Sequence, residues 1–401
     1  MPSLRERVEK ELLRVTTLRH KLHEIPELCF EEHKTADFIR GELMTLGIDF
    51  IDGIDNCETA TIAHVGPATN PCIALRADID GLPITERIDR PYRSKHDGRM
   101  HACGHDGHTA TLLGTAAILK QIERDLSFCV KLIFQPAEEG GGGGERLMKA
   151  GLAEGKLGPK PEAIFGLHGW PNLPTGRVSS KAGPLLAATD QFYINLVGKG
   201  THGAMPHTGR DPVVAAAELV SNLQQVASRD FDPTEPVVVT VGKLHGGTAV
   251  NVIPDEALIA GTARTLSEPA RKLVREALER RTHGVAAANG CNADFDWRVG
   301  YPPLINDPTA FNYVVRQARH ALGNNAFIPA AKPAMGGEDF SYYLKKIPGC
   351  FFLVGLQHGS EPMPQLHSDR FDFTDMALGT GMMMFLHLVQ NFGSWRDPNA
   401  R

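Results

Sequence analysis

The chain has 401 residues, of which 42% are hydrophobic and 22% charged, and its formal net charge is -5 at pH 7. This length allows two or three domains with substantial cores, and the composition is that of an ordinary globular protein. Without a basic face, the chain does not have the features of a nucleic-acid-binding protein, and a small-molecule substrate is the better expectation. Seven cysteines without a Cys-x-x-Cys pair indicate reduced thiols rather than a disulfide framework.

The first residues, Met1–Glu6, lead directly into a charged amphipathic helix. They lack the apolar core of a secretory signal peptide. No later stretch has the length and hydrophobicity of a transmembrane helix. We therefore expect a cytoplasmic protein without a membrane partner.

Short apolar runs in the first half of the chain each lead to acidic or imidazole side chains. Pro136 ends the second of these strands and places the two glutamates that follow it in a loop. Ligands of open α/β sheets bind beyond the carboxyl ends of the strands, so we expect one shared site. The runs and their polar side chains are 72–75 with Asp78 and Asp80, 129–134 with Glu138 and Glu139, and 163–167 with His168.

The densest group of chemically active side chains lies within Met100–His108, which holds one thiol, three imidazoles and a carboxylate. Thiolate and neutral imidazole are the preferred ligands of zinc and its neighbours. Cys103 and His105 can direct two donors at one point if the backbone turns at Gly104. The alternative is a surface histidine cluster beside a buried cysteine.

A run of five glycines, Gly140–Gly144, directly follows the tandem glutamates. Glycine leaves the backbone open to close approach, which favours a functional loop over a patch of solvated charge. No Lys-Ser or Lys-Thr pair follows the run, so a phosphate-binding loop is not expected.

The pattern of expected elements divides the chain into three segments. Residues 1–186 and 300–401 alternate strands and helices, which predicts an α/β catalytic domain of two to three layers around a central mixed sheet. Residues 187–299 have the order βαββαβ, which predicts an inserted ferredoxin-like α+β domain. The strands expected in the insert are 190–197, 236–244, 257–264 and 292–299, and the helices are 212–228 and 269–288.

Ordered blocks along nearly the whole chain resemble the metal-dependent aminoacylase and carboxypeptidase family. They fit its amidohydrolase branch of hippurate hydrolases, N-acyl-amino-acid deacylases and plant auxin-conjugate hydrolases. The blocks are 19–28, 75–83, 100–108, 135–139, 166–168, 246–254 and 335–340. The resemblance implies an enzyme that cleaves N-acyl amino acids to a carboxylate and a free amino acid. It also implies that the insert is a lid that forms a homodimer or a higher homo-oligomer.

Carried over to this sequence, the resemblance implies two divalent metal ions per subunit, with Cys103 bridging them. A bridging thiolate is chemically reasonable because each cation lowers the pKa of the thiol. Most of the wider family has an aspartate at the bridging place, so manganese, zinc, nickel and cobalt all stay open. The implied ligands are Cys103, His105, Glu139, His168 and His367.

Catalysis by such a site needs a group that takes a proton from a metal-activated water and later gives one to the leaving amine. We expect Glu138 to be this general acid and base. By resemblance, His202 donates to the tetrahedral oxyanion from the lid of the partner subunit. Thr201 stands where a glycine is expected before this histidine, and His207 is as compatible with a surface role as with a functional one.

Substrate binding is assigned to the lid and to one glycine-rich turn. Asn251 and Arg264 resemble the anchors for the carboxylate of the amino-acid half, because the fork of Arg matches a carboxylate in two hydrogen bonds. Gly337 is expected to line the pocket. Glu338 and Asp80 are expected to support the site without binding metal.

Two other functions stay open from the sequence. The first is a thiol hydrolase with Cys103 as nucleophile and His105 or His108 as base. The second is a non-catalytic protein that binds metal or amino acids, although such a protein would have no need of Glu138. Benzoyl, acetyl, longer acyl and indole-acetyl substrates all stay open. Supporting roles are expected for His101 and His108, and Asp106 is expected to orient a ligating histidine.

Overall fold

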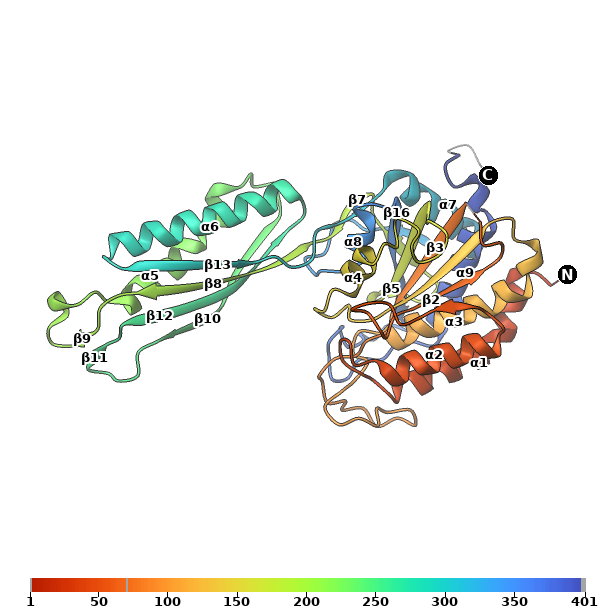
Figure 1. The fold of residues 1–401 in the computed structure, drawn as a ribbon, viewed down its shortest axis with the longest axis horizontal. Helices are drawn as coiled ribbons and strands as arrows, with labels where there is room; N and C mark the ends of the chain where they lie inside the picture. Colours follow the sequence, from red (N-terminus) through yellow and green to blue (C-terminus); the bar gives the residue numbers. More distant parts are fainter. Residues whose placement is uncertain (1, 70, 398–401) are drawn as a thin grey trace. The chain divides into compact units, whose positions relative to one another are not determined.

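The computed structural model describes residues 2–69 and 71–397, which form two compact units (Figure 1). Unit 1 is drawn from the segments Met1–Gly183, Ile305–Lys332 and Asp339–Arg401, and unit 2 from Pro184–Leu304 and Pro333–Glu338. The short segment Pro333–Glu338 therefore belongs to unit 2, whereas the sequence pattern grouped it with residues 300–401.

Unit 1 is built on an eight-stranded mixed sheet with the order β1-β2-β4-β3-β5-β16-β6-β15. Its four central strands are parallel to their central neighbours, while β2 runs antiparallel to β4 and β6 runs antiparallel to β16. Strands β3 and β4 are buried throughout, as expected of parallel strands covered on both faces. The strands are β1 (Phe50–Ile51), β2 (Thr61–Val65), β3 (Cys72–Asp78), β4 (Cys129–Gln135), β5 (Ala163–Pro174), β6 (Val178–Ser180), β15 (Phe327–Pro329) and β16 (Gly349–Gln357).

Helices α1, α3, α7 and α9 of unit 1 pack on one another, and α3, α7 and α9 also contact the sheet. Helices α4 and α8 form a separate contact pair. The helix starts follow local capping chemistry: Ser3 and Glu6 form a capping box at α1, and Asp307 caps α7 ahead of Pro308. The helices are α1 (Leu4–His23), α2 (His33–Thr45), α3 (His105–Gln121), α4 (Gly143–Lys149), α7 (Pro308–Leu322), α8 (Ser341–Leu344) and α9 (Met376–Gln390).

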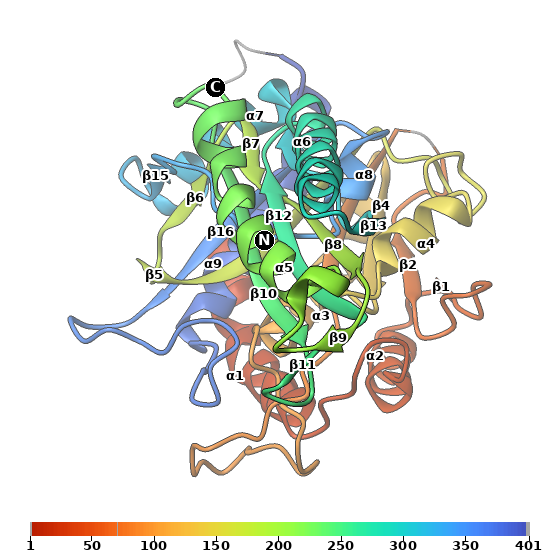
Figure 2. The ribbon, with the colours of Figure 1, turned by 90° about the vertical axis from the view of Figure 1, so that its left-hand side faces the viewer.

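Unit 2 has the predicted βαββαβ order and a four-stranded antiparallel sheet, β10-β12-β8-β13. Helices α5 and α6 contact each other and the sheet, so they cover one of its faces (Figures 1 and 2). The elements are β8 (Ala188–Val197), α5 (Pro212–Leu223), β10 (Val237–Gly246), β12 (Glu256–Thr265), α6 (Glu268–Ala288) and β13 (Asn292–Arg298). The predicted fold class, an α/β sheet domain with a ferredoxin-like unit, is confirmed.

The boundaries in unit 2 differ from the prediction mainly at one helix. The α-helix expected over 212–228 ends at Leu223, and Val226–Asp230 winds more widely as a π-helix. A small ladder pairs β9 (Thr201–His202) with β11 (Val252–Ile253). Strands β7 (Gly183–Leu186) and β14 (Leu304–Asn306) lie at the points where the chain passes between units.

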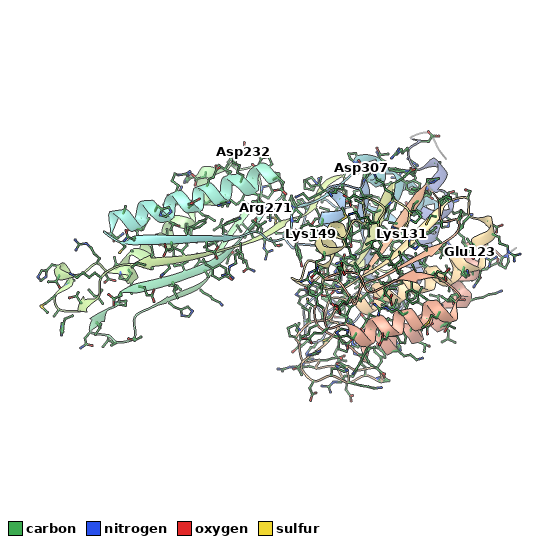
Figure 3. All side chains as sticks on the ribbon, viewed as in Figure 1. Glu123, Lys131, Lys149, Asp232, Arg271 and Asp307 are labelled. Carbon is green, nitrogen blue, oxygen red and sulfur yellow. The ribbon has the colours of Figure 1, made fainter. Side chains whose placement is uncertain are left out.

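Buried cations tie layers together within each unit, and two of them are Arg271 and Lys131 (Figure 3). In unit 2, Arg271 of α6 donates to both carboxylate oxygens of Asp190, at 2.7 and 2.6 Å, and to the carbonyl of Gly300 at 2.7 Å. In unit 1, the Nζ of Lys131 donates to the carbonyl of Leu157 at 2.5 Å. Such charges are retained in an interior because hydrogen bonds compensate for their lost hydration.

All seven cysteines are free, which confirms the expectation of reduced thiols. Among the described residues, no helix combines the length and the apolar character needed to cross a membrane.

Candidate metal centre

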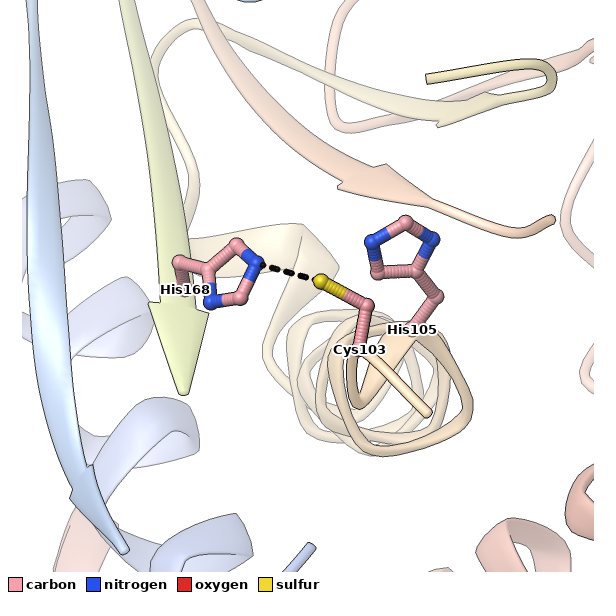
Figure 4. A group of neighbouring side chains, drawn as sticks. All are labelled: Cys103, His105 and His168. Carbon is pink, nitrogen blue, oxygen red and sulfur yellow. Dashed lines mark hydrogen bonds between the residues drawn. The ribbon is translucent and has the colours of Figure 1, made fainter. Parts of the chain in front are cut away.

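Polar side chains that lie on or just beyond the strands of unit 1 meet around Cys103. The loop that carries Cys103 turns at Gly104, whose φ of 87° lies in the left-handed region, and α3 begins at the next residue. His168 extends from β5, so the Sγ of Cys103 lies 3.3 Å from its Nε2 (Figure 4). Candidate ligand atoms of Cys103, His105 and His168 all lie within 4.8 Å of one another.

A second group of candidate ligands shares the same thiol. Ligand atoms of Cys103, Glu139 and His367 also lie within 4.8 Å of one another, and the Oε1 of Glu139 is 3.1 Å from the Nε2 of His367. A further group joins His105 to Glu138 and Glu139. The five side chains predicted to bind metal are thus together, and Cys103 is common to two groups, as a bridging ligand must be.

The histidine tautomers fit metal binding. The Nδ1 of His105 lies 2.9 Å from the carbonyl of Asp80, and its buried Nε2 has no hydrogen-bond partner among the described residues. The Nδ1 of His168 lies 2.7 Å from the carbonyl of Gly169, which leaves its Nε2 directed at Cys103. Metal-binding histidines are commonly fixed in this way, with one nitrogen donating to an oxygen and the other directed at the ion.

The electrostatics of the cluster also favour a cation. Burial and the nearby imidazole of His108 lower the pKa of His168 well below its usual value, so this side chain is neutral and able to bind metal. Burial, Glu139 and Glu138 raise the pKa of the Cys103 thiol well above its usual value. A divalent ion would compensate these carboxylates and stabilise the thiolate.

The same facts argue against Cys103 as a catalytic nucleophile, because such a thiol needs a lowered pKa and a base. Both ring nitrogens of His108 already have hydrogen-bond partners. Its Nδ1 lies 2.6 Å from the Oδ1 of Asp78, and its Nε2 accepts from the backbone N–H of Gly169 at 2.8 Å. His108 thus holds the middle of β5, next to His168, in place. Burial opposes charge on His105, but Asp78 and Asp80 outweigh it and raise the pKa of His105 to about 10. A protonated imidazole is a poor base, and a divalent cation bound at the Nε2 of His105 would displace the ring proton.

Buried carboxylates hold the loop that bears the tandem glutamates. Asp80 accepts from the backbone N–H of Glu138 at 3.0 Å and from that of Glu139 at 2.9 Å, one bond on each oxygen. Glu32 accepts from the N–H of Ala137 at 2.9 Å. The carboxylate of Asp80 thus supports both the loop and His105, as its predicted supporting role requires. Sequence reasoning missed Glu32, which no motif marks.

Two ordinary residues beside the cluster have strained backbones. Ala137 has a φ of 56° and His367 a φ of 65°, a backbone region that residues other than glycine rarely adopt. The N–H of His367 donates to the carbonyl of Ala102 at 2.8 Å, which ties its loop to the Cys103 loop. In the glycine run, a Cβ on Gly143 would lie 1.8 Å from the carbonyl oxygen of Pro136, so this position requires glycine.

The structure corrects the role expected for Asp106. Its Oδ2 lies 2.8 Å from the Nε of Arg19 and 2.8 Å from the Nδ1 of His23, neither of which is a candidate ligand. The first turn of α3 directs this carboxylate toward α1, so it does not orient a ligating histidine. His101 is buried, and neither of its ring nitrogens has a hydrogen-bond partner among the described residues.

The residues predicted to contact substrate all belong to unit 2. His202 is exposed in β9, where its Nδ1 accepts from the N–H of Ala204 at 3.0 Å. Asn251 is exposed, and its carbonyl accepts from the N–H of Gly203 at 2.8 Å. Arg264 is half-buried on β12, where its guanidinium makes no hydrogen bond with another described residue but interacts electrostatically with Asp190.

The turn around Gly337 is also part of unit 2. A Cβ on Gly337 would lie 2.1 Å from the Cγ2 of Thr189, so the turn has no room for a side chain. Glu338 is buried and His207 is exposed. The predicted residues are therefore divided, with the predicted metal ligands and Glu138 on unit 1 and the predicted substrate contacts on unit 2.

Comparison with known proteins identifies relatives of this chain. The chain is 42% identical to N-acetyl-L-cysteine deacetylase of Bacillus subtilis over 87% of its length and 81% of that protein. It is 38% identical to the IAA-amino acid hydrolase ILR1-like 4 of Arabidopsis thaliana, over 94% of this chain and 84% of that one.

Among solved structures, the YXEP protein of Bacillus subtilis, described as a dinuclear metal binding peptidase, superposes with a TM-score of 0.82. It is 37% identical and covers 95% of this chain and 98% of its own. The model of peptidase family M20/M25/M40 matches residues 74–391. The resemblance seen in the sequence blocks is thereby confirmed, and this chain belongs to peptidase family M20/M25/M40.

Proposed function

We propose that this protein is a dimetal amidohydrolase that cleaves N-acyl amino acids to a carboxylate and a free amino acid. The observation that carries the proposal is the pair of donor groups sharing Cys103, with the carboxylate of Glu138 beside them. The similar proteins named above act on N-acetylcysteine and on amino acid conjugates of IAA, which supports the substrate class.

The metal site would hold two divalent cations per subunit. One would take His105 and His168, the other Glu139 and His367, and Cys103 would bridge them. Sulfur and imidazole favour zinc, nickel and cobalt over magnesium and calcium, and the carboxylate of Glu139 also suits manganese, so these four metals are the candidates.

Glu138 would carry the proton transfers. The two cations would supply Lewis acidity, which acidifies the attacking water and polarises the amide carbonyl. Glu138 is 6% exposed, its backbone N–H is held by Asp80, and its Oε1 accepts from the N–H of Asp339 at 3.4 Å. A carboxylate fixed in this way accepts the proton of water and delivers a proton to the nitrogen of the leaving amine.

Unit 2 would recognise the amino-acid half of the substrate. The half-buried guanidinium of Arg264 is suited to bind the carboxylate. Asn251 would assist Arg264, and Gly337 would line the pocket. We further infer a cytoplasmic homodimer formed through unit 2, in which His202 of one subunit donates to the oxyanion in the other.

A panel of substrates tests the proposed activity. Protein reconstituted with each candidate cation is offered N-acetyl, N-benzoyl, longer N-acyl and indole-acetyl amino acids, and release of free amine is measured. We expect hydrolysis of at least one class, with loss of rate when the substrate carboxylate is replaced by an amide. Metal binding without turnover of any substrate would contradict the proposal and favour a binding protein.

Subunit mixing tests the role of His202. His202→Ala and Glu138→Gln proteins, each nearly inactive, are mixed under conditions that allow subunits to exchange. If His202 acts in trans, each mixed dimer has one site with both groups intact. Random pairing makes half of the dimers mixed, so activity should approach about a quarter of wild type.

The control for this experiment is a mixture in which subunit exchange is followed by an independent label. A histidine that acts within its own subunit would restore nothing, because each site would still lack one group. Exchange without rescue would therefore contradict the trans assignment.

A further inference from the structure

Arg19 is a fully buried cation that the proposed mechanism does not use. It lies on α1, and its guanidinium binds three carboxylates. Its Nε donates to the Oδ2 of Asp106 at 2.8 Å, its Nη1 to the Oδ1 of Asp375 at 3.3 Å, and its Nη2 to the Oδ1 of Asp372. Each nitrogen of the fork therefore holds a different carboxylate, which a lysine could not reproduce.

The three carboxylates come from two of the segments that carry candidate ligands. Asp106 follows His105 directly, in the first turn of α3. Asp372 and Asp375 follow His367 in the segment that leads to α9. Arg19 thus joins the segment with Cys103 and His105 to the segment with His367, which are far apart in the sequence.

The surroundings of Arg19 are built to keep it in place. The ring of Tyr92 lies 4.8 Å from its guanidinium carbon, and the hydroxyl of Tyr92 donates to the Oδ2 of Asp372 at 2.9 Å. Arg90 lies 2.5 Å from the Oδ1 of Asp372, and the Nε2 of His20 lies 3.0 Å from the Oδ2 of Asp375. Removing one partner from such a buried network leaves an uncompensated charge, which is strongly unfavourable.

His367 is the candidate ligand that most needs such support. Its side chain is 52% exposed, whereas Cys103, His105 and His168 are buried in the packed interior. Its φ of 65° is also strained. Core packing therefore does not fix the position of His367, so the contacts of the residues on either side of it in the chain must do so.

We infer that Arg19 is a positioning residue that sets the separation between the Cys103 loop and His367, and thereby the affinity for the second of two bound cations. The inference rests on the proposed dimetal function. Arg19 itself contacts neither ligand atoms nor substrate in this arrangement. It acts through Asp106 on one segment and through Asp372 and Asp375 on the other.

The experiment measures binding of Co²⁺ to wild type and to Arg19→Lys by equilibrium dialysis. Electronic absorption follows the Co²⁺–thiolate band, and circular dichroism checks the fold. Lysine keeps the charge but loses the fork. We expect the first Co²⁺ to bind as in wild type with the thiolate band kept, and the second to bind about 10–100-fold more weakly, the usual effect of changing an outer-shell partner.

The matched control is Arg271→Lys, which alters another buried Arg–Asp pair but lies in unit 2. It should bind both Co²⁺ ions as wild type does. If Arg19→Lys does not fold, Asp372→Asn and Asp375→Asn replace it, because these carboxylates are 37% and 36% exposed and tolerate substitution better.

Equal affinity for both Co²⁺ ions in folded Arg19→Lys, or in both aspartate variants, would overturn the inference. So would equal weakening of both ions, or weakening in Arg271→Lys of the same size. A wild type that binds no Co²⁺ would instead contradict the proposed dimetal function, so the two failures are distinguishable.

Discussion

Removal of metal by a chelator should abolish hydrolysis of N-acyl amino acids, and a divalent cation should restore it. The reason is the donor set, because in the proposed mechanism it is the bound cations that acidify the attacking water. Activity and metal content are measured on the same samples before and after reconstitution. Cys103→Ala should lower both, since Cys103 belongs to two donor groups.

The matched control is Cys291→Ala, which removes a buried thiol from unit 2 and should leave metal content unchanged. Alkylation of the cysteines gives a second control, provided that the effect of modifying Cys29 is separated from that of modifying Cys103. The Sγ of Cys29 is 3.2 Å from the carbonyl of Glu139, and this cysteine is partly exposed, so its modification could disturb the loop. Full activity in metal-free protein would contradict the metal mechanism and favour the thiol hydrolase.

The parts of the site that could be predicted from sequence are those with a local signal. The apolar runs before Asp80 and Glu138 do end at strand ends, and strand ends of one sheet meet in space. The strand end expected before His168 was wrong, because β5 continues past it to Pro174. The βαββαβ order of unit 2 could be predicted for the same reason, since each helix or strand has its own periodic pattern in consecutive residues.

The supporting residues could not be predicted, because their partners are distant in sequence. Nothing around Glu32 or Arg19 indicates that the first accepts from Ala137 or that the second binds Asp372. Asp106 shows the converse error: adjacency to His105 suggested a shared role, but neighbouring residues on a helix point in different directions. The end of α5 at Leu223 was missed because apolar periodicity continues into the π-helix.

Glu138→Gln should separate binding from chemistry. Glutamine keeps an oxygen that can accept from the N–H of Asp339, but an amide cannot take up a proton. We expect metal content and substrate affinity close to wild type and a loss of roughly a hundredfold or more in kcat, the usual scale for general acid–base catalysis. Steady-state kinetics and elemental analysis of the same preparation measure both quantities.

Glu139→Gln should give the opposite result, because the Oε1 of Glu139 lies with Cys103 and His367 in a candidate ligand group. Loss of the negative charge should weaken metal binding, so activity should recover in part at high cation concentration. Glu145→Gln is the matched control: Glu145 lies on α4 beyond the glycine run and forms an exposed pair with Lys149. It should change neither metal binding nor activity.

If Glu138→Gln loses metal while Glu139→Gln keeps it and loses only kcat, the two glutamates have been assigned the wrong way round. Asp80 would then hold the backbone of the loop in the same way, and only the direction of the two side chains would need to be exchanged.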